Sequence, residues 1–319
     1  MTGVQTCALP ILGYLSGEMI GQSILKLYPK GVQLSDIRKK FMDKMQDGSG
    51  SIQELVKQVS KDGNEVILSM AMSPMHDTKG KLQGILALGQ DVTERVHLHE
   101  QLVESYQRIR NIQGASIFAL AKLAEARDGE TGSHLKRLQA YCECLCRRLS
   151  MKTKYSNQLY EDYILDLVQC SVLHDIGKLV IPDSILFHPG RFTENDFEIM
   201  KQHALFGGKA LEEAAIEAGE GQSYLTVGCE VCYYHHEKWD GSGYPFGLKG
   251  EHIPLSARIV AVCDVYDALT TERRYKPAYT HEEASSFVEK ESGRHFDPDI
   301  IQTFTEIKAD FAKIAKKVL

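Results

Sequence analysis

The sequence predicts a multidomain chain, with an α+β domain in its N-terminal third and an all-α domain in the remainder. Residues 12–94 alternate short apolar runs with turns, which is typical of strands. Residues 114–319 show helical periodicity in one stretch after another, separated by Gly and Pro, without the alternation of a sheet. A length of 319 residues fits about two such domains.

The composition is that of a globular protein, with 43% hydrophobic and 25% charged residues. A net charge of −6 argues against a nucleic-acid or anionic-membrane binder, but it leaves open a local basic pocket for a small phosphate ligand. No run approaches eighteen apolar residues, and no signal-peptide pattern is present. We therefore expect a cytoplasmic protein with no membrane segment in this chain.

The first eleven residues, MTGVQTCALPI, are expected to lie outside the fold. They resemble the translated sequence of a common DNA-sequencing adapter, and a short natural tail is the alternative. The adapter interpretation implies that residues 1–11 are an artefact, that the natural protein is longer and that Cys7 has no role.

Two strands and a hairpin turn are predicted near the end of the first domain. The strands are EVILSMAMSPM (65–75) and LQGILALGQDVTE (82–94), and TKGK (78–81) forms the turn. Together with GYLSGEMIGQSILKLYP (13–29) and the closing DVTER, they resemble the C-terminal two-thirds of a PAS sensory domain. The resemblance implies a truncated PAS-like sensory domain at 12–94. His97 and His99 follow it, and we interpret them as solvated helix residues and not as haem ligands.

Residues 95–113 are predicted to form a linker helix, because they are charged and mostly helix-forming. Leu98, Leu102, Ile109 and Ile112 lie near heptad positions, and Ser105 interrupts the set. A helix that pairs in a homodimer and a plain connector both fit this pattern.

The cysteines outside the first eleven residues are interpreted as reduced core residues. Cys142, Cys144 and Cys146 lie on a predicted helix where Cys144 points away from the other two, so the three cannot bind one ion. Cys229 and Cys232 form a lone C-x-x-C without a second pair at zinc-finger spacing, which favours core packing.

Histidines and aspartates recur at or near apolar helix faces of the second domain. Burying so many ionisable groups would cost several kcal/mol each unless cations compensate. A mixed imidazole and carboxylate set suits iron, manganese or zinc, and the absence of thiolates disfavours a structural zinc site. The predicted set is His134, His174, Asp175, His203, His235, His236 and Asp264.

Two motifs carry a resemblance to a known family. HDIGK (174–178) followed by HHEKWDGSGYP (235–245) resembles the signature of the HD-GYP family of cyclic di-GMP phosphodiesterases. The segments GLKGEHIPLSARIVAVCDVYDALTTERRYK (247–276) and SGRHFDPDI (292–300) continue it. The resemblance implies an all-α HD-type metal-dependent phosphohydrolase domain at 114–319, which hydrolyses cyclic di-GMP to pGpG, with further cleavage to GMP left open.

The resemblance also implies roles for individual residues. The seven residues above match the family's metal ligands, with Asp175 as the bridge between ions, and His174, Asp175 and Lys178 are the expected catalytic set. Lys178, Arg273 and Lys276 match residues that hold substrate phosphates. The loop formed by Asp240, Gly241, Gly243, Tyr244 and Pro245 is linked to substrate access and to contact with partners such as a GGDEF-domain protein, although it also fits a rigid turn.

Glu130 decides how many ions are expected. It precedes His134 by four residues, so on a helix both side chains reach the same side. Family members with a glutamate here look like a three-metal branch, whereas the alternative is a solvated acid near a helix start. We expect two or three divalent ions, with iron favoured and manganese the alternative. Such ions can activate water and neutralise a phosphodiester, so no nucleophilic side chain is required.

Three alternatives stay open at this point. In the first, the enzyme hydrolyses another cyclic dinucleotide. In the second, it catalyses a different phosphohydrolase reaction of the HD superfamily. In the third, the domain binds metal or nucleotide without turnover.

Overall fold

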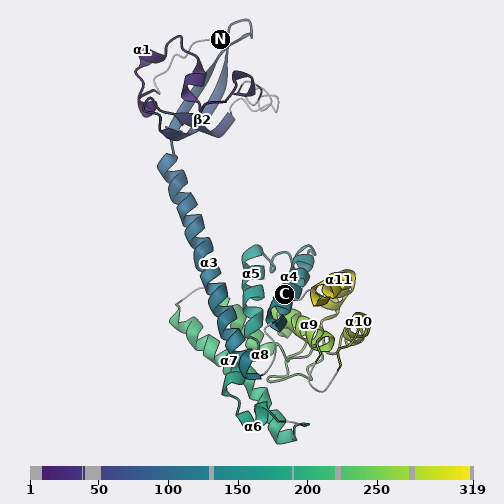
Figure 1. Cartoon of the computed structure of the whole chain (residues 1–319). Helices are drawn as coiled ribbons and strands as arrows, with labels where there is room; N and C mark the ends of the chain where they lie inside the picture. The colour runs from purple at the N-terminus through teal and green to yellow at the C-terminus, as the bar shows by residue number, and fades with distance from the viewer. Residues whose placement is uncertain are drawn as a thin grey trace. The chain divides into compact units, whose positions relative to one another are not determined.

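The computed structural model describes residues 9–37, 39, 52–128, 133–188, 190–219, 224–272 and 277–316. The chain divides into two compact units, Met1–Ile109 and Arg110–Leu319. Figure 1 shows strands in the first unit and helices throughout the second. Among the described residues, none of the helices is long and apolar enough to span a membrane.

The first unit contains a three-stranded antiparallel sheet in the order β1-β2-β3. Its strands are β1 (Ile52–Val59), β2 (Glu65–His76) and β3 (Leu82–Asp91). The two predicted strands and the hairpin are therefore confirmed, whereas β1 was not predicted. In the hairpin, Asp77 Oδ1 accepts hydrogen bonds from the backbone N–H groups of Lys79 and Lys81 at 2.8 and 2.9 Å. Gly80 supplies the positive φ of +76° that the turn requires.

Short helical turns cover the sheet and close a small core. They are η1 (Leu9–Leu12), α1 (Ser16–Met19) and η2 (Ile24–Leu27). Leu12 follows the segment that was expected to lie outside the fold. It is buried, and its carbonyl accepts a hydrogen bond from the N–H of Lys61 at 2.9 Å. The core residues are Leu12, Tyr14, Met19, Leu27, Val66, Leu68 and Met70.

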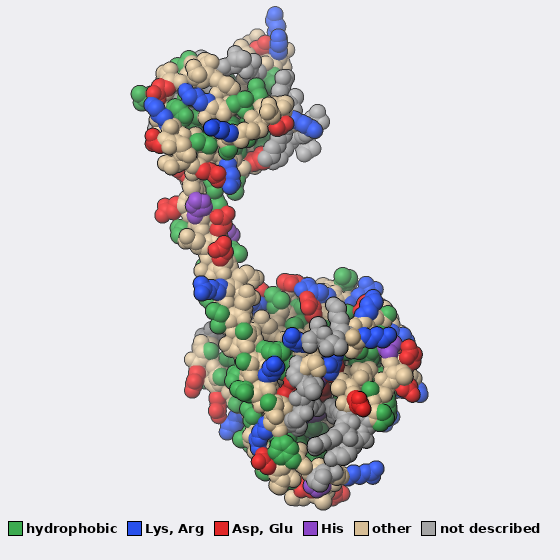
Figure 2. Space-filling view, viewed as in Figure 1, with side chains coloured by type: hydrophobic (Ala, Val, Ile, Leu, Met, Phe, Trp, Pro, Cys, Tyr) green, Lys and Arg blue, Asp and Glu red, His purple; other side chains and the backbone are tan. Residues whose placement is uncertain are grey.

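A single long helix, α3 (Thr93–Asp128), starts directly after β3 and reaches into the second unit. Asp91 Oδ1 accepts hydrogen bonds from the N–H and hydroxyl of Thr93 at 2.9 and 2.6 Å, which fixes the first turn. Helix α3 extends at both ends beyond the predicted linker helix. Figure 2 shows apolar and charged side chains exposed along it. His97 and His99 are exposed, as predicted.

The regular elements that the structure describes in the second unit are all helices, apart from one isolated bridge between Ser292 and Phe296. This confirms the all-α prediction. Its α-helices are α4 (Ser133–Ser150), α5 (Glu161–Cys170), α6 (Asp183–Leu186), α7 (Glu194–Glu217), α8 (Tyr224–Tyr234), α9 (Leu255–Thr270), α10 (His281–Lys290) and α11 (Pro298–Lys316). The 3-10 turns are η3 (Ser171–Leu173), η4 (Ile176–Val180) and η5 (Gly250–His252).

The main core lies where α4, α9 and α11 meet. The Tyr141 ring stacks on Phe311 at 4.7 Å, and Tyr266 meets both rings edge-on. Each fully buried apolar side chain contributes about 1.5–3 kcal/mol. Cys142 and Cys146 belong to this core, as the helical periodicity predicts. All cysteines among the described residues are free thiols.

One predicted helix is interrupted. The periodicity of YILDLVQCSVLHDIGKL predicts an unbroken helix, but α5 ends at Cys170 and two 3-10 turns follow. Asp175 lies between those turns with φ −102° and ψ 8°. The spacing of four residues between His174 and Lys178 predicts that they share one face of an α-helix, and this prediction is therefore wrong. The reason is tertiary, because Gly177 packs directly against the backbone of α7, where an added Cβ would collide with the His203 carbonyl.

Candidate metal centre

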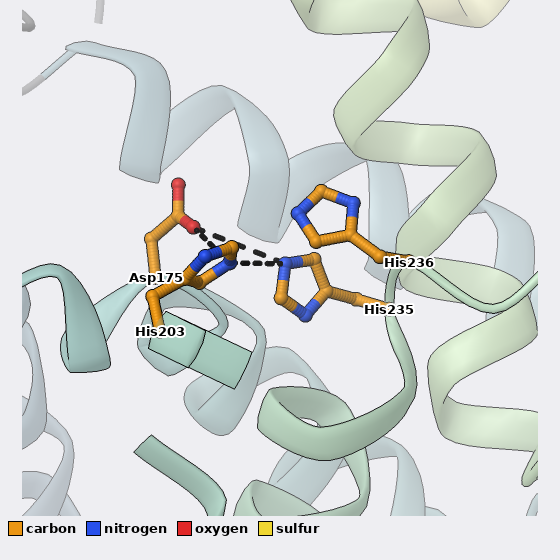
Figure 3. Close-up of side chains that lie close together, drawn as sticks. All are labelled: Asp175, His203, His235 and His236. Atoms are coloured by element: carbon orange, nitrogen blue, oxygen red, sulfur yellow. Dashed lines mark hydrogen bonds and ion pairs between the residues drawn. The ribbon is translucent and has the colours of Figure 1, made fainter. Parts of the chain in front are cut away.

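Two groups of side chains converge in the second unit, and together they contain seven of the eight residues predicted as ligands, the exception being Glu130. Within each group the possible ligand atoms lie within 4.8 Å of one another. The first group comes from the turn after η3, from α7 and from the end of α8, and Figure 3 shows its side chains facing one another. The first group is Asp175, His203, His235 and His236, and the second is His134, His174 and Asp264.

Asp175 faces both groups with different oxygens. Its Oδ1 lies 3.2 Å from Nε2 of His203 and 3.8 Å from Nε2 of His235. Its Oδ2 lies 3.3 Å from Nε2 of His174 in the second group. Asp264 Oδ1 completes that group at 3.9 Å from the same His174 nitrogen. One carboxylate thus lies between two clusters of imidazole nitrogens.

The imidazoles are oriented by their outer nitrogens. Nδ1–H of His174 donates to the Ser171 carbonyl at 2.9 Å, and that of His203 donates to the Met200 carbonyl at 2.7 Å. Nδ1–H of His235 donates to the Val231 carbonyl at 3.0 Å. Because a carbonyl can only accept, each Nδ1 carries a proton, and in the neutral imidazole Nε2 then has the lone pair. The lone pairs are directed toward the shared centre, as metal ligation requires.

The environment of the His174 Nε2 atom is evidence that a cation fits between the side chains of the second group. This nitrogen is buried and lies 3.3 Å from Asp175 Oδ2, but it makes no hydrogen bond of good geometry to any described residue. A buried polar atom whose hydrogen bonding is not satisfied costs about 1–3 kcal/mol. A divalent cation between His174, His134 and Asp264 would satisfy that atom, so the donor set fits a metal ion.

The three imidazoles of the first group are neutral near pH 7. Burial lowers the pKa of His236 to about 3 and, helped by the neighbouring imidazoles, lowers that of His235 well below its ordinary value. Burial also lowers the pKa of His203, against the opposing effect of Asp175. Neutral imidazole is the form that binds a metal.

The second group behaves differently. Burial alone would lower the pKa of His174, but the charges of Asp175 and Asp264 raise it to about 10. Burial would also lower the pKa of His134, but its hydrogen bond to Asp267 and the charges of Asp264 and Asp267 together raise it. Without a cation, the His174 imidazole would therefore carry a second proton at pH 7.

Asp175 is ionised despite its surroundings. Burial would raise the pKa of this carboxyl, but Lys178 and the nearby imidazoles hold it well below its ordinary value. Lys178 Nζ lies 2.8 Å from Asp175 Oδ2, so the predicted phosphate-binding lysine is at the site.

Asp267 and Arg137 orient His134, and both were missed from the sequence. Nδ1 of His134 donates to Asp267 Oδ2 at 2.7 Å. Arg137 holds the same buried carboxylate with two donors, at 2.6 and 2.8 Å. A carboxylate behind a metal-binding histidine fixes its ring and raises its basicity. Asp267 follows Asp264 by three residues on α9, which was the available sequence signal.

The predicted loop at 240–245 lies beside the first group. The Tyr244 ring is 4.7 Å from the His236 ring and tilted by 30°. Buried Glu237, also missed, fixes the chain after the loop by accepting hydrogen bonds from the N–H groups of Phe246, Gly247 and Leu248 at 2.7–3.1 Å. Gly243 packs against the backbone at Glu237 and leaves no room for a Cβ. The loop is a closely packed turn that also borders the first group.

Three predicted site residues lie outside the described part of the chain. They are Glu130, Arg273 and Lys276.

The sequence matches two known families. Residues 119–300, more than half of the chain, match the HD domain, and residues 6–94 match the PAS domain. The HD match contains all seven side chains of the two groups.

Curated relatives align with about two thirds to three quarters of this chain. A Vibrio cholerae protein named "Probable cyclic di-GMP phosphodiesterase" is 45% identical over 69% of this chain and 50% of its own length. A "Cyclic di-GMP phosphodiesterase" of the same species is 40% identical over 75% of this chain and 49% of its own. A third, "3'3'-cGAMP-specific phosphodiesterase 2", is 35% identical over 65% of this chain and 37% of its own length. This chain thus spans half or less of the length of each.

Proposed function

The chain belongs to the HD-domain family with a PAS domain ahead of it, and we propose that it is a metal-dependent phosphodiesterase that hydrolyses cyclic di-GMP to pGpG. The observation that carries this proposal is Asp175, which faces two clusters of imidazole nitrogens with its two oxygens. Relatives named as cyclic di-GMP phosphodiesterases support the choice of substrate.

We propose that His203, His235 and His236 hold one ion, that His134, His174 and Asp264 hold another, and that Asp175 bridges the two. Bound ions would supply the Lewis acidity that activates a water and neutralises the phosphodiester. Lys178, next to Asp175, is positioned to bind a phosphoryl oxygen and to stabilise the charge that develops there. Arg273 and Lys276 are proposed to add phosphate contacts.

Two ions are the number that these two groups support. We propose a third ion at Glu130. We also propose that the metal is iron, with manganese as the alternative. Elemental analysis of anaerobically purified protein tests both proposals. The cytoplasmic location, a homodimer through the linker helix and a GGDEF-domain partner at the 240–245 loop are proposals of the same kind.

Turnover by the anaerobically purified, metal-loaded protein tests the function, with products separated by chromatography. Wild type is expected to convert cyclic di-GMP to pGpG. His174→Ala and Asp175→Ala are expected to lose at least 100-fold in kcat, because each removes a donor from the centre. Helical circular dichroism should stay nearly unchanged. His252→Ala, an exposed histidine outside the two groups, is the matched control.

Wild-type turnover by either site variant would contradict the proposal. The relative named as a 3'3'-cGAMP-specific phosphodiesterase makes a different cyclic dinucleotide the second candidate. Parallel assays with cyclic di-GMP and 3'3'-cGAMP decide between them. Tight nucleotide binding without any product would identify a regulatory module.

A further inference from the structure

Arg127, near the C-terminal end of α3, makes several contacts with a short segment next to the metal centre. Its guanidinium donates to the carbonyls of Lys178 at 3.3 Å, of Leu179, and of Ile181 at 2.9 Å. It also pairs with Asp183 at 2.6 Å. The contacts with three carbonyls are made to the end of η4, the turn that follows Asp175 and contains Lys178.

The opposite side of this segment is fixed by helix α7. Gly177 lies against the backbone of His203 and Gly207 so closely that a Cβ would not fit. The segment is therefore held between α7 and Arg127. Leu179 and Val180 are 43% and 63% exposed, so burial does little to fix them. Ile181, at the end of the segment, is buried, and the hydrogen bonds of Arg127 connect the backbone on either side of Val180 to α3.

The last turns of α3 also border the centre itself. Ala121 and Ala124 line a cavity of about 10 Å³ together with His134, His174 and Lys178. Such a volume holds about one water molecule. A change in the position of α3 would therefore move part of the cavity wall. Through Arg127, it would also move the backbone that follows Asp175.

We propose that Arg127 is a positioning residue: it fixes the 178–181 backbone and thereby sets the places of Asp175 and Lys178. Only arginine presents a planar fork of N–H donors that can serve several carbonyls at once. Arg127 acts through other residues and needs no contact with metal or substrate. The consequence for turnover rests on the proposed function, whereas the consequence for metal affinity does not.

The test measures Mn²⁺ binding to the metal-free full chain by calorimetry, together with turnover of cyclic di-GMP. Arg127→Ala is expected to weaken Mn²⁺ binding about tenfold and to lower kcat at saturating Mn²⁺, because Asp175 and Lys178 lose their fixed positions. Arg127→Lys, which keeps one donor group, should fall between wild type and the alanine variant. Asp183→Asn is the control, because Asp183 is 73% exposed and its loss leaves the carbonyl contacts intact.

A purely structural role would lower the melting temperature and leave Mn²⁺ affinity unchanged, and that result would overturn the proposal. An equal loss of affinity in Asp183→Asn would overturn it too. If Arg127→Ala does not fold, a weaker Mn²⁺ affinity of Arg127→Lys than of wild type supports the proposal, and an unchanged affinity overturns it. If wild type hydrolyses no cyclic di-GMP, the proposed function is wrong. The Mn²⁺ affinities of the variants then still show whether Arg127 is a positioning residue.

Discussion

The residues of the centre differ in how they carry protons, although most of them are of one type. His236, His235 and His203 have lowered pKa values because burial penalises their charged form. His174, only one residue from Asp175, has its pKa raised to about 10 by the surrounding carboxylates. The difference arises from the position of each imidazole relative to the acids, which no sequence pattern specifies.

This difference predicts that the two groups bind metal with different pH dependence. His174 is protonated below a pKa of about 10, so an ion that binds it must displace that proton. Affinity at this group should rise about tenfold per pH unit between pH 6 and 8 for each proton displaced. His236, with a pKa of about 3, is already neutral there, and affinity at its group should be nearly constant.

Calorimetry of Mn²⁺ binding in buffers of different ionisation enthalpy measures the protons released by each ion. One ion is expected to release protons at pH 7, and the other is expected to release almost none. Equal release from both ions, or none from either, would contradict the pKa pattern. His174→Ala should remove the proton-releasing event and leave the other event in place.

At the scale of elements, sequence periodicity predicted most of the helices that carry the site. Helices α4, α7 and α9 lie within residues 114–319, where apolar spacing predicted a series of helices, and they position His134, His203 and Asp264. The break after α5 was not predicted, because it depends on contact between Gly177 and α7 and not on local propensity. Asp267 and Glu237 were missed for a related reason, since their partners are set by tertiary packing.

The contact at Gly177 leads to a prediction about η4. Gly177→Ala places a Cβ against the carbonyl of His203, so η4 and α7 must separate. Such overpacking typically costs about 1–3 kcal/mol, and it should also weaken metal binding because Asp175 and His203 lie on the two elements. Thermal unfolding followed by circular dichroism and Mn²⁺ titration measure the two effects.

The matched control is Gly84→Ala, because a Cβ added at Gly84 meets nothing within 4 Å. It should leave both the unfolding temperature of the second unit and the Mn²⁺ affinity unchanged. Wild-type stability and affinity in Gly177→Ala would show that η4 can move away from α7 without affecting the centre.

At the scale of the whole molecule, a single helix leaves the PAS domain and ends beside the candidate metal centre. The heptad pattern on its first half was visible in the sequence, and the structure adds that those apolar side chains are exposed. The side chains are Leu98, Leu102, Ile109 and Ile112. What covers this row could not be predicted from one sequence, because pairing and a plain connector give the same pattern.

We predict that the row pairs with the same row of a second chain. Leu102 and Ile109, 67% and 55% exposed, lie seven residues apart and would both face the partner. The double substitution Leu102→Glu and Ile109→Glu would put like charges opposite one another and should raise the dimer dissociation constant more than tenfold.

Val103→Glu is the control on the same helix, because Val103 is 49% exposed but lies outside the heptad positions. Light scattering after size-exclusion chromatography at several concentrations measures the change. A wild-type chain that stays monomeric at every concentration, or a Val103→Glu chain that dissociates as readily as the double variant, would make α3 a plain connector.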